Sequence, residues 1–204
     1  MSQLRVAVIG AGHLGKIHAR LLPEIEGVTL VAIADPSPAV HRNLIDKTDV
    51  PVLSDYRKIV DGIDAAIVAT PTHGHFDIAQ DLLSRSLHVL IEKPITDCPY
   101  QARQLLELAQ DNGCVLSVGH VEQHNPAVRF AFESVGQPRF IQAARLCCYT
   151  FRCTVIGVVH DLMILYIDLC NTAFPGKMMR SHACGFSVFG GHEDVAQARI
   201  QFNC

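Results

Sequence analysis

The chain has 204 residues, of which 49% are hydrophobic and 18% charged, and its formal net charge is −3. This length and composition are typical of a globular protein with one large domain or two modest ones. A mild negative charge without a cluster of Lys and Arg argues against nucleic acid or anionic lipid as a partner. No apolar run reaches the roughly 18 residues that cross a bilayer, and the first residues lack a signal-peptide pattern. We therefore expect a cytoplasmic protein without a membrane segment.

Short apolar runs alternate with helical patterns over the first two thirds of the chain. Nearly continuous apolar strands joined by helices predict a parallel sheet covered on both faces, as in an α/β fold. The expected strands are 4–9, 28–34, 65–69, 88–91 and 115–118, and the expected helices are 13–22, 76–84 and 101–110.

The pattern changes after about residue 120, which indicates a second, α+β domain. We expect the domains to span residues 1–120 and 121–204, the second with an open, mostly antiparallel sheet. Its predicted elements are a strand at 139–145, a helix at 158–169, and strands at 181–189 and 195–202. The chain stops at the last of these strands without a closing helix, so we interpret the second domain as incomplete.

The chain contains eight cysteines, and six of them lie in its last third. No pair has C-x-x-C spacing, and the size and the missing signal peptide argue against a disulfide scaffold. We interpret the cysteines as free thiols and expect no metal site, because no set of His, Cys, Asp and Glu has metal-ligand spacing. The six are Cys147, Cys148, Cys153, Cys170, Cys184 and Cys204.

The turn Gly10-Ala11-Gly12-His13-Leu14-Gly15 has the G-x-G-x-x-G spacing of dinucleotide-binding folds. This spacing alone is a weak signal, but here it follows an apolar strand and opens a helix, as the fingerprint requires. Gly10 permits the tight turn, Gly12 lets the backbone approach a pyrophosphate at the helix N-terminus, and Gly15 lets the helix pack on the strand. A glycine turn in an unrelated α/β protein is the alternative interpretation.

Asp35 stands twenty residues after Gly15, at the end of the second predicted strand. A carboxylate at this place accepts hydrogen bonds from the ribose 2′-hydroxyl of NAD and repels the 2′-phosphate of NADP. We therefore expect NAD as the cofactor, with NADP less favoured. The imidazoles of His13 and His18 are interpreted as groups on the helix surface.

Three further strands end in polar residues, and ligands of open α/β sheets lie beyond the carboxyl ends of the strands. Lys93 follows one of these strands and could orient a substrate hydroxyl and stabilise charge on its oxygen. A solvated surface lysine explains Lys93 equally well, and an exposed loop position is the alternative for His75. The residues expected to bind the cofactor are Gly10, Gly12, His13, Leu14, Gly15, Asp35, Thr70, Pro71, His75, Glu92, Lys93 and Pro94.

Taken together, these motifs resemble the Gfo/Idh/MocA oxidoreductases. The resemblance continues through residues 157–164 and the turn at 190–194, and it is nearest to the branch of UDP-N-acetylglucosamine and UDP-N-acetylglucosaminuronate 3-dehydrogenases. The stretches that carry it are Val6-Ala7-Val8-Ile9-Gly10 with the rest of the glycine turn, Glu92-Lys93-Pro94, and Gly119-His120-Val121-Glu122 followed by Asn125-Pro126.

The resemblance implies a two-domain enzyme that transfers a hydride between NAD and a hydroxyl group of a sugar, sugar nucleotide or cyclitol. The family's catalytic lysine matches Lys93, and its helix aspartate matches Asp161. Lys93, His120, Asn125 and Asp161 would contact the substrate. A complete second domain would also imply a homo-oligomer.

The chain departs from the family pattern at the general base, a histidine four residues after the helix aspartate. Leu165 occupies this position and cannot accept a proton. Tyr166 is the candidate that would act in its place. Family members are also longer, which supports a C-terminal truncation. Three hypotheses follow: a dehydrogenase that is active or impaired, a non-catalytic dinucleotide-binding protein, and a truncated inactive homologue.

Overall fold

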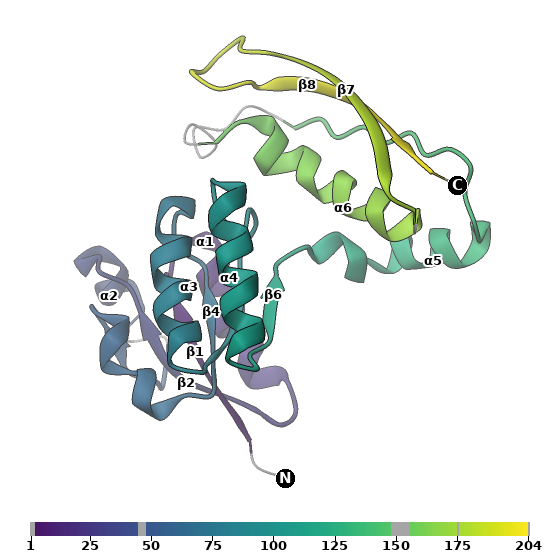
Figure 1. The fold of residues 1–204 in the computed structure, drawn as a ribbon. Helices are drawn as coiled ribbons and strands as arrows, with labels where there is room; N and C mark the ends of the chain where they lie inside the picture. The colour runs from purple at the N-terminus through teal and green to yellow at the C-terminus, as the bar shows by residue number, and fades with distance from the viewer. Residues whose placement is uncertain (1–2, 45–47, 148–155, 175, 204) are drawn as a thin grey trace. The chain divides into compact units, whose positions relative to one another are not determined.

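The computed structural model describes residues 3–44, 48–147, 156–174 and 176–203 (Figure 1). Backbone contacts divide the chain into two units, residues 1–119 and 120–204. Each unit has a sheet of its own, six-stranded and parallel in the first, two-stranded and antiparallel in the second. The predicted combination of an α/β and an α+β part is confirmed.

Six strands form the sheet of the first unit: β1 (Leu4–Ile9), β2 (Val28–Ala34), β3 (Val52–Leu53), β4 (Ala65–Val68), β5 (His88–Ile91) and β6 (Leu116–Val118). Their order is β3-β2-β1-β4-β5-β6, and every neighbouring pair is parallel. The chain runs outward in both directions from β1, so the order reverses between β1 and β4. Open α/β sheets bind their ligands at such a switch point.

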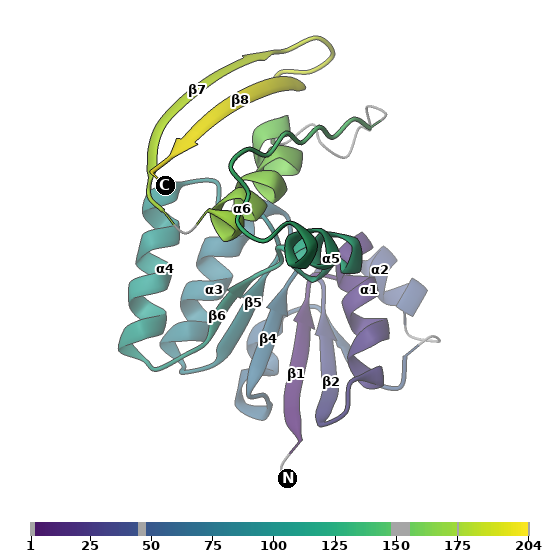
Figure 2. The same ribbon diagram turned by 90° about the vertical axis from the view of Figure 1, so that its right-hand side faces the viewer.

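Four helices cover the two faces of this sheet (Figures 1 and 2): α1 (His13–Leu21), α2 (Pro38–Leu44), α3 (His75–Ser84) and α4 (Pro99–Asp111). Side chains alternate across a strand, so Val8 packs in one apolar cluster with residues of α1 and α2, while Ile9 packs in the other with α3 and α4. Burial on both faces explains why these strands are almost continuously apolar in sequence.

The core on the α3 and α4 face provides a matched test of burial. Leu105 and Leu106 are neighbours on α4, but Leu105 is fully buried and Leu106 is 51% exposed. Leu105→Ala is expected to lower the free energy of unfolding by about 2–5 kcal/mol, because it leaves a cavity in a packed core. Leu106→Ala should change it by about 0.5 kcal/mol or less. Urea denaturation of both variants measures the difference, and equal losses would contradict this packing.

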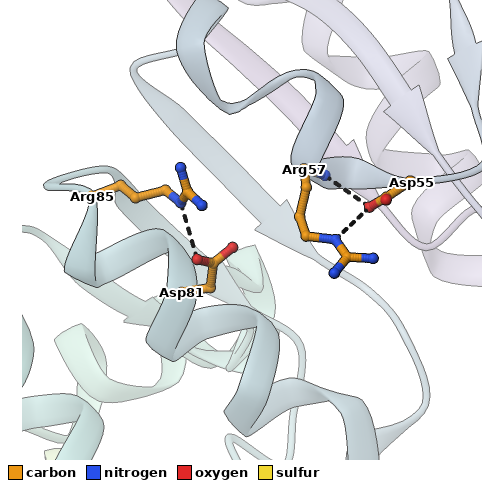
Figure 3. Close-up of polar contacts among 4 residues, drawn as sticks. All are labelled: Asp55, Arg57, Asp81 and Arg85. Carbon is orange, nitrogen blue, oxygen red and sulfur yellow. Dashed lines mark hydrogen bonds and ion pairs between the residues drawn. The ribbon is translucent and has the colours of Figure 1, made fainter.

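Short 3₁₀ helices fill several connections: η1 (Leu22–Glu24), η2 (Tyr56–Lys58), η3 (Val60–Gly62) and η4 (Thr72–Gly74). Asp55 caps η2, accepting hydrogen bonds from the Arg57 backbone N (3.1 Å) and Nε (2.9 Å) (Figure 3). Arg57 thereby lowers the pKa of Asp55. On α3, Arg85 Nε donates to Asp81 at 3.0 Å across one helical turn. Such solvent-accessible pairs fix local geometry more than they add stability.

The second unit contains η5 (Val121–His124), α5 (Pro126–Val135), a π-helical turn η7 (Val159–Met163), α6 (Ile164–Ala173), β7 (Met178–Phe186) and β8 (Val195–Phe202). Strands β7 and β8 pair antiparallel, with His182 opposite Arg199. The rings of Phe174 and Phe202 stack with centroids 5.2 Å apart, which joins the end of α6 to the end of β8. The predicted helix and the last two strands are confirmed.

The strand predicted at residues 139–145 is wrong, because these residues have no regular secondary structure. An extended segment becomes a strand only when its backbone groups pair with a neighbouring strand. Neither sheet in the described part of the chain includes this segment. Helix α5, which precedes it, is not among the predicted elements.

Five cysteines are described, and all are free thiols: Cys98, Cys114, Cys147, Cys170 and Cys184. Burial raises the pKa of the Cys114 and Cys170 thiols. Cys148, Cys153 and Cys204 lie outside the described residues. Within the described ranges, no helix is both long and apolar enough to cross a membrane, and no group of three or more His, Cys, Asp or Glu could hold a metal ion.

Candidate dinucleotide-binding site

The carboxyl ends of the parallel strands bring the predicted cofactor residues of the first unit to one edge of the sheet. The backbone ladder continues one residue beyond the strands, which fixes the start of each loop. Gly10 N donates to Ala34 O at 2.7 Å, and Glu92 N donates to Val68 O at 2.9 Å. The glycine turn after β1, Asp35 after β2, Thr70 after β4 and Lys93 after β5 therefore lie along this edge.

The three glycines of the turn meet different surroundings. Gly10 has a φ of +89°, and a Cβ there would lie 2.6 Å from Ala69 O. A Cβ on Gly15 would overlap the carbonyl oxygen of Gly10, so helix α1 packs directly on the turn. A Cβ on Gly12 would have no protein atom within 4 Å. Two glycines thus serve the fold, whereas Gly12 borders open space that a ligand can approach.

Helix α1 begins at this open position. Gly12 is its N-cap, no side chain caps the helix, and its first turn contains no acidic residue. The first backbone N–H groups of a helix have no partner inside the helix, and together with the helix dipole they favour an anion. A pyrophosphate fits this turn, because the backbone N–H groups supply donors and Gly12 leaves room.

Asp35 is oriented by two backbone hydrogen bonds. Ala11 N donates to Asp35 Oδ2 at 2.8 Å, and Ser37 N donates to Oδ1 at 2.8 Å. His41 Nε2, on α2, contacts the backbone oxygen of Asp35. A carboxylate has about four acceptor positions, so two remain for hydroxyl groups. The glycine turn and the predicted ribose acceptor are therefore parts of one hydrogen-bonded unit.

The end of β4 presents a hydroxyl group with no protein partner. Thr70 Oγ1 is buried and makes no hydrogen bond to any described residue, and such groups in native proteins usually have one. His75, the first residue of α3, is instead 1% exposed, and its Nδ1 and Nε2 lie 2.9 Å from Pro94 O and 2.8 Å from Thr70 O. Both nitrogens of His75 face protein carbonyls, which leaves neither for a cofactor, so we propose a positioning role for it.

Lys93 is half-buried between two buried residues, Glu92 and Pro94. The Glu92 carboxylate is 6% exposed and lies 2.7 Å from His18 Nε2. His18 is therefore more than a surface group: its side chain keeps 23% of its exposure, but its ring contacts the buried Glu92 carboxylate. It lies one turn from buried Gly15 on α1, and this helical spacing was the signal that sequence reasoning missed.

The first turn of α5 in the second unit is a compact polar cluster. Asn125 caps the helix by accepting from Ala127 N at 3.0 Å, and its Nδ2 donates to Glu122 Oε2 at 3.0 Å. Arg145 Nη1 donates to Glu122 Oε1 at 2.8 Å and holds the pKa of that carboxyl below its usual range. The pKa of Arg145 is raised, mainly by Glu122 and further by Tyr166. Asn125, predicted as a substrate contact, is already committed to the helix end.

The predicted catalytic residues of the second unit lie on one continuous helix. Asp161 belongs to the π-helical turn η7, a feature that is frequent at functional sites. Leu165 is 5% exposed and Tyr166 is half-buried, both in the first turn of α6. Asp168 accepts from Gln123 Nε2 at 2.8 and 2.7 Å, which ties α6 to η5. His120 Nδ1 is buried and has no described hydrogen-bond partner.

Similarity to known proteins identifies the family of this chain. The model of the Gfo/Idh/MocA family, described as an oxidoreductase family with an NAD-binding Rossmann fold, matches residues 4–120. The chain belongs to this family. A UDP-N-acetylglucosamine 3-dehydrogenase of Acidithiobacillus ferrooxidans is 29% identical over all 204 residues, which cover 64% of that protein. A scyllo-inositol 2-dehydrogenase (NAD(+)) of Bacillus subtilis is 30% identical over 129 residues, 61% of this chain and 38% of that protein.

Solved structures of Gfo/Idh/MocA relatives agree with this membership. The structure of the Acidithiobacillus ferrooxidans enzyme matches the whole chain with a TM-score of 0.91 at 29% identity, and 67% of that enzyme is covered. GenD2 from gentamicin A biosynthesis, in complex with NAD, matches with a TM-score of 0.87 at 25% identity over 99% of this chain and 63% of that one. The chain thus spans about two thirds of the length of these relatives.

Proposed function

We propose that this chain is an NAD-dependent oxidoreductase that transfers a hydride between NAD and a hydroxyl-bearing carbon of a sugar, sugar nucleotide or cyclitol. The observation that carries the proposal is the glycine turn whose Ala11 N–H is bonded to Asp35, beside a helix N-terminus with no side-chain cap. The relatives named above, which act on sugar-nucleotide and inositol hydroxyls, support the substrate class. A cytoplasmic location is part of the same proposal, and so is a homo-oligomeric state if the second domain is complete.

In this proposal each residue of the site has a separate role. Oxidation of a CH–OH group to a carbonyl releases a hydride and a proton, and bound NAD supplies the hydride acceptor. The turn at Gly12 binds the pyrophosphate and Asp35 binds the ribose hydroxyls. Lys93 donates a hydrogen bond to the substrate oxygen, which orients it and stabilises developing negative charge. Asp161 helps to hold the substrate, and Tyr166 is the candidate proton acceptor.

A binding and turnover assay tests the function. NADH fluorescence should report binding at micromolar concentrations, and a panel of UDP-sugars and inositols should include a substrate that reduces NAD. Failure of NADH to bind would refute the cofactor assignment. Binding without turnover on any member of the panel would instead support the second candidate, a non-catalytic dinucleotide-binding protein, which is favoured by Leu165 at the position of the general base.

Asp35 is expected to set the preference between NAD and NADP. Asp35→Ala should weaken NADH binding by about tenfold to 100-fold, since hydrogen bonds to a charged group contribute about 1.5–3 kcal/mol. The same substitution should also reduce the difference in affinity between NADH and NADPH, because the charge that repels the 2′-phosphate is gone. Fluorescence titrations with both cofactors measure the two effects. Asp111→Ala is the control, because Asp111 is exposed at the end of α4. An unchanged ratio of NADH affinity to NADPH affinity in Asp35→Ala would disprove this role of Asp35.

A further inference from the structure

The segment that carries Lys93 is fixed on its first side by a hydrogen bond between the buried Glu92 carboxylate and the His18 imidazole. Glu92 precedes Lys93, and its carboxylate lies 2.7 Å from His18 Nε2. An ionised carboxylate only accepts hydrogen bonds, so the hydrogen lies on Nε2 of His18. The same carboxylate packs against Gly119, where a Cβ would lie 2.9 Å from Glu92 Oε2. Glu92 is thus connected to α1 and to the end of β6, and a buried carboxylate of this kind needs its partner.

The segment is fixed on its second side by His75. Pro94 follows Lys93, and its carbonyl oxygen lies 2.9 Å from His75 Nδ1, while His75 Nε2 lies 2.8 Å from Thr70 O. A carbonyl oxygen accepts and cannot donate, so a ring nitrogen of His75 bonds its carbonyl only when that nitrogen carries the hydrogen. The buried ring therefore lies between the loop after β5 and the end of β4, with one ring nitrogen facing a carbonyl oxygen of each.

We propose that His18 and His75 are positioning residues that together hold Lys93 at the cofactor edge of the sheet. Lys93 has a flexible four-carbon side chain, so its ammonium group can be placed only if its backbone is fixed. The two histidines fix the residues before and after it, and they connect them to the helix of the glycine turn and to Thr70. This proposal rests on the proposed dehydrogenase function of the same site.

Two amide substitutions of His75 separate its contacts. The amide nitrogen of asparagine takes the place of Nδ1, so His75→Asn keeps the contact with Pro94 O and loses the contact with Thr70 O. The amide nitrogen of glutamine takes the place of Nε2, so His75→Gln keeps Thr70 and loses Pro94. We expect His75→Gln to lower kcat by about 100-fold with little change in NADH affinity, because Lys93 is misplaced. His75→Asn should retain kcat and weaken NADH binding. Equal effects of the two variants on both quantities would overturn the proposal.

Hydrogen–deuterium exchange gives a readout that needs no substrate. The backbone amides of Glu92 and Lys93 should exchange faster in His75→Gln than in His75→Asn, and ¹⁵N NMR of the unsubstituted protein should show a hydrogen on Nδ1 of His75, the nitrogen that faces Pro94 O. An Nδ1 without a hydrogen, or equal exchange in the two variants, would refute the role of His75 even if both variants were unstable or turnover were absent. Absence of turnover on the substrate panel counts against the proposed function alone.

The His18 contact is tested in the same way. His18→Gln keeps a donor in the place of Nε2, so kcat should be retained and the Glu92 amide should still exchange slowly. The side chain of His18→Asn is too short to reach Glu92, so kcat should fall and the Glu92 amide should exchange faster. His88→Asn, at the opposite end of β5, is the control, since its oxygen can replace the ring acceptor for Val115 N. If His18→Asn matches His18→Gln in the exchange rate at Glu92 and in kcat, the contact between His18 and Glu92 does not position Lys93.

Discussion

Gly12→Ala is expected to weaken NADH binding by about tenfold to 100-fold while leaving the fold of the first unit intact. The added methyl group meets no protein atom within 4 Å, and the φ of −68° at this residue is allowed for alanine. The methyl group would occupy the space through which a pyrophosphate approaches the backbone, and hydrogen bonds to that charged group contribute about 1.5–3 kcal/mol each. NADH titration measures the affinity, and thermal unfolding measures the stability.

Two other glycines give the matched comparison. Gly10→Ala should lower both affinity and stability, because a residue other than glycine is strained at a φ of +89° and its Cβ would collide with Ala69 O. Gly62→Ala should change neither NADH affinity nor stability, since Gly62 lies in η3 and a Cβ there meets no protein atom within 4 Å. Unaltered NADH binding by Gly12→Ala would show that the cofactor does not approach this turn, and would remove the main support for the proposed function.

The sheet of the first unit was predictable because burial on both faces leaves a strong local signal. The strands 4–9, 28–34 and 88–91 coincide with β1, β2 and β5. Strand β3 has two residues and is defined by its pairing with β2, so no local pattern indicates it. Helix α2 has only seven residues, too few for a clear helical pattern. The segment 139–145 shows the opposite failure, since an apolar pattern does not form a strand without a partner.

The candidate site was predictable where its chemistry follows from the backbone, and not where it depends on distant contacts. The glycine turn and Asp35 stand at fixed places in the βαβ unit, so their spacing is visible in sequence. His18 and Glu92 are 74 residues apart, and the partners of His75 are backbone carbonyls, which leave no trace in residue types. Residue spacing in the sequence predicts the ligand-binding loops. The side chains that hold those loops in place are identified only from the three-dimensional packing.

Leu165→His is expected to raise the rate of sugar oxidation by about 100-fold or more, because a positioned general base contributes about 10²–10⁴-fold. In the proposed match to the family pattern, Leu165 takes the place of the general-base histidine, four residues after Asp161. The substitution also places an imidazole at a position only 5% exposed in α6. It should therefore cost about 1–3 kcal/mol of stability, since a buried polar group without a partner is unfavourable. Steady-state rates on the substrate panel and thermal unfolding measure the two effects.

Leu169→His is the control for this gain, because Leu169 lies one turn further along the same helix and is similarly buried at 9% exposure. It should lose stability without gaining rate. Tyr166→Phe tests the proton acceptor that the unsubstituted chain would use. Alone, Tyr166→Phe should strongly lower any basal oxidation rate. In combination with Leu165→His, it should lower the rate much less. The double variant Leu165→His, Tyr166→Asp supplies the histidine and removes the tyrosine hydroxyl in one protein. If the unsubstituted protein turns over and neither Tyr166→Phe nor the double variant alters its rate, the proton leaves by another group and Leu165 does not limit catalysis.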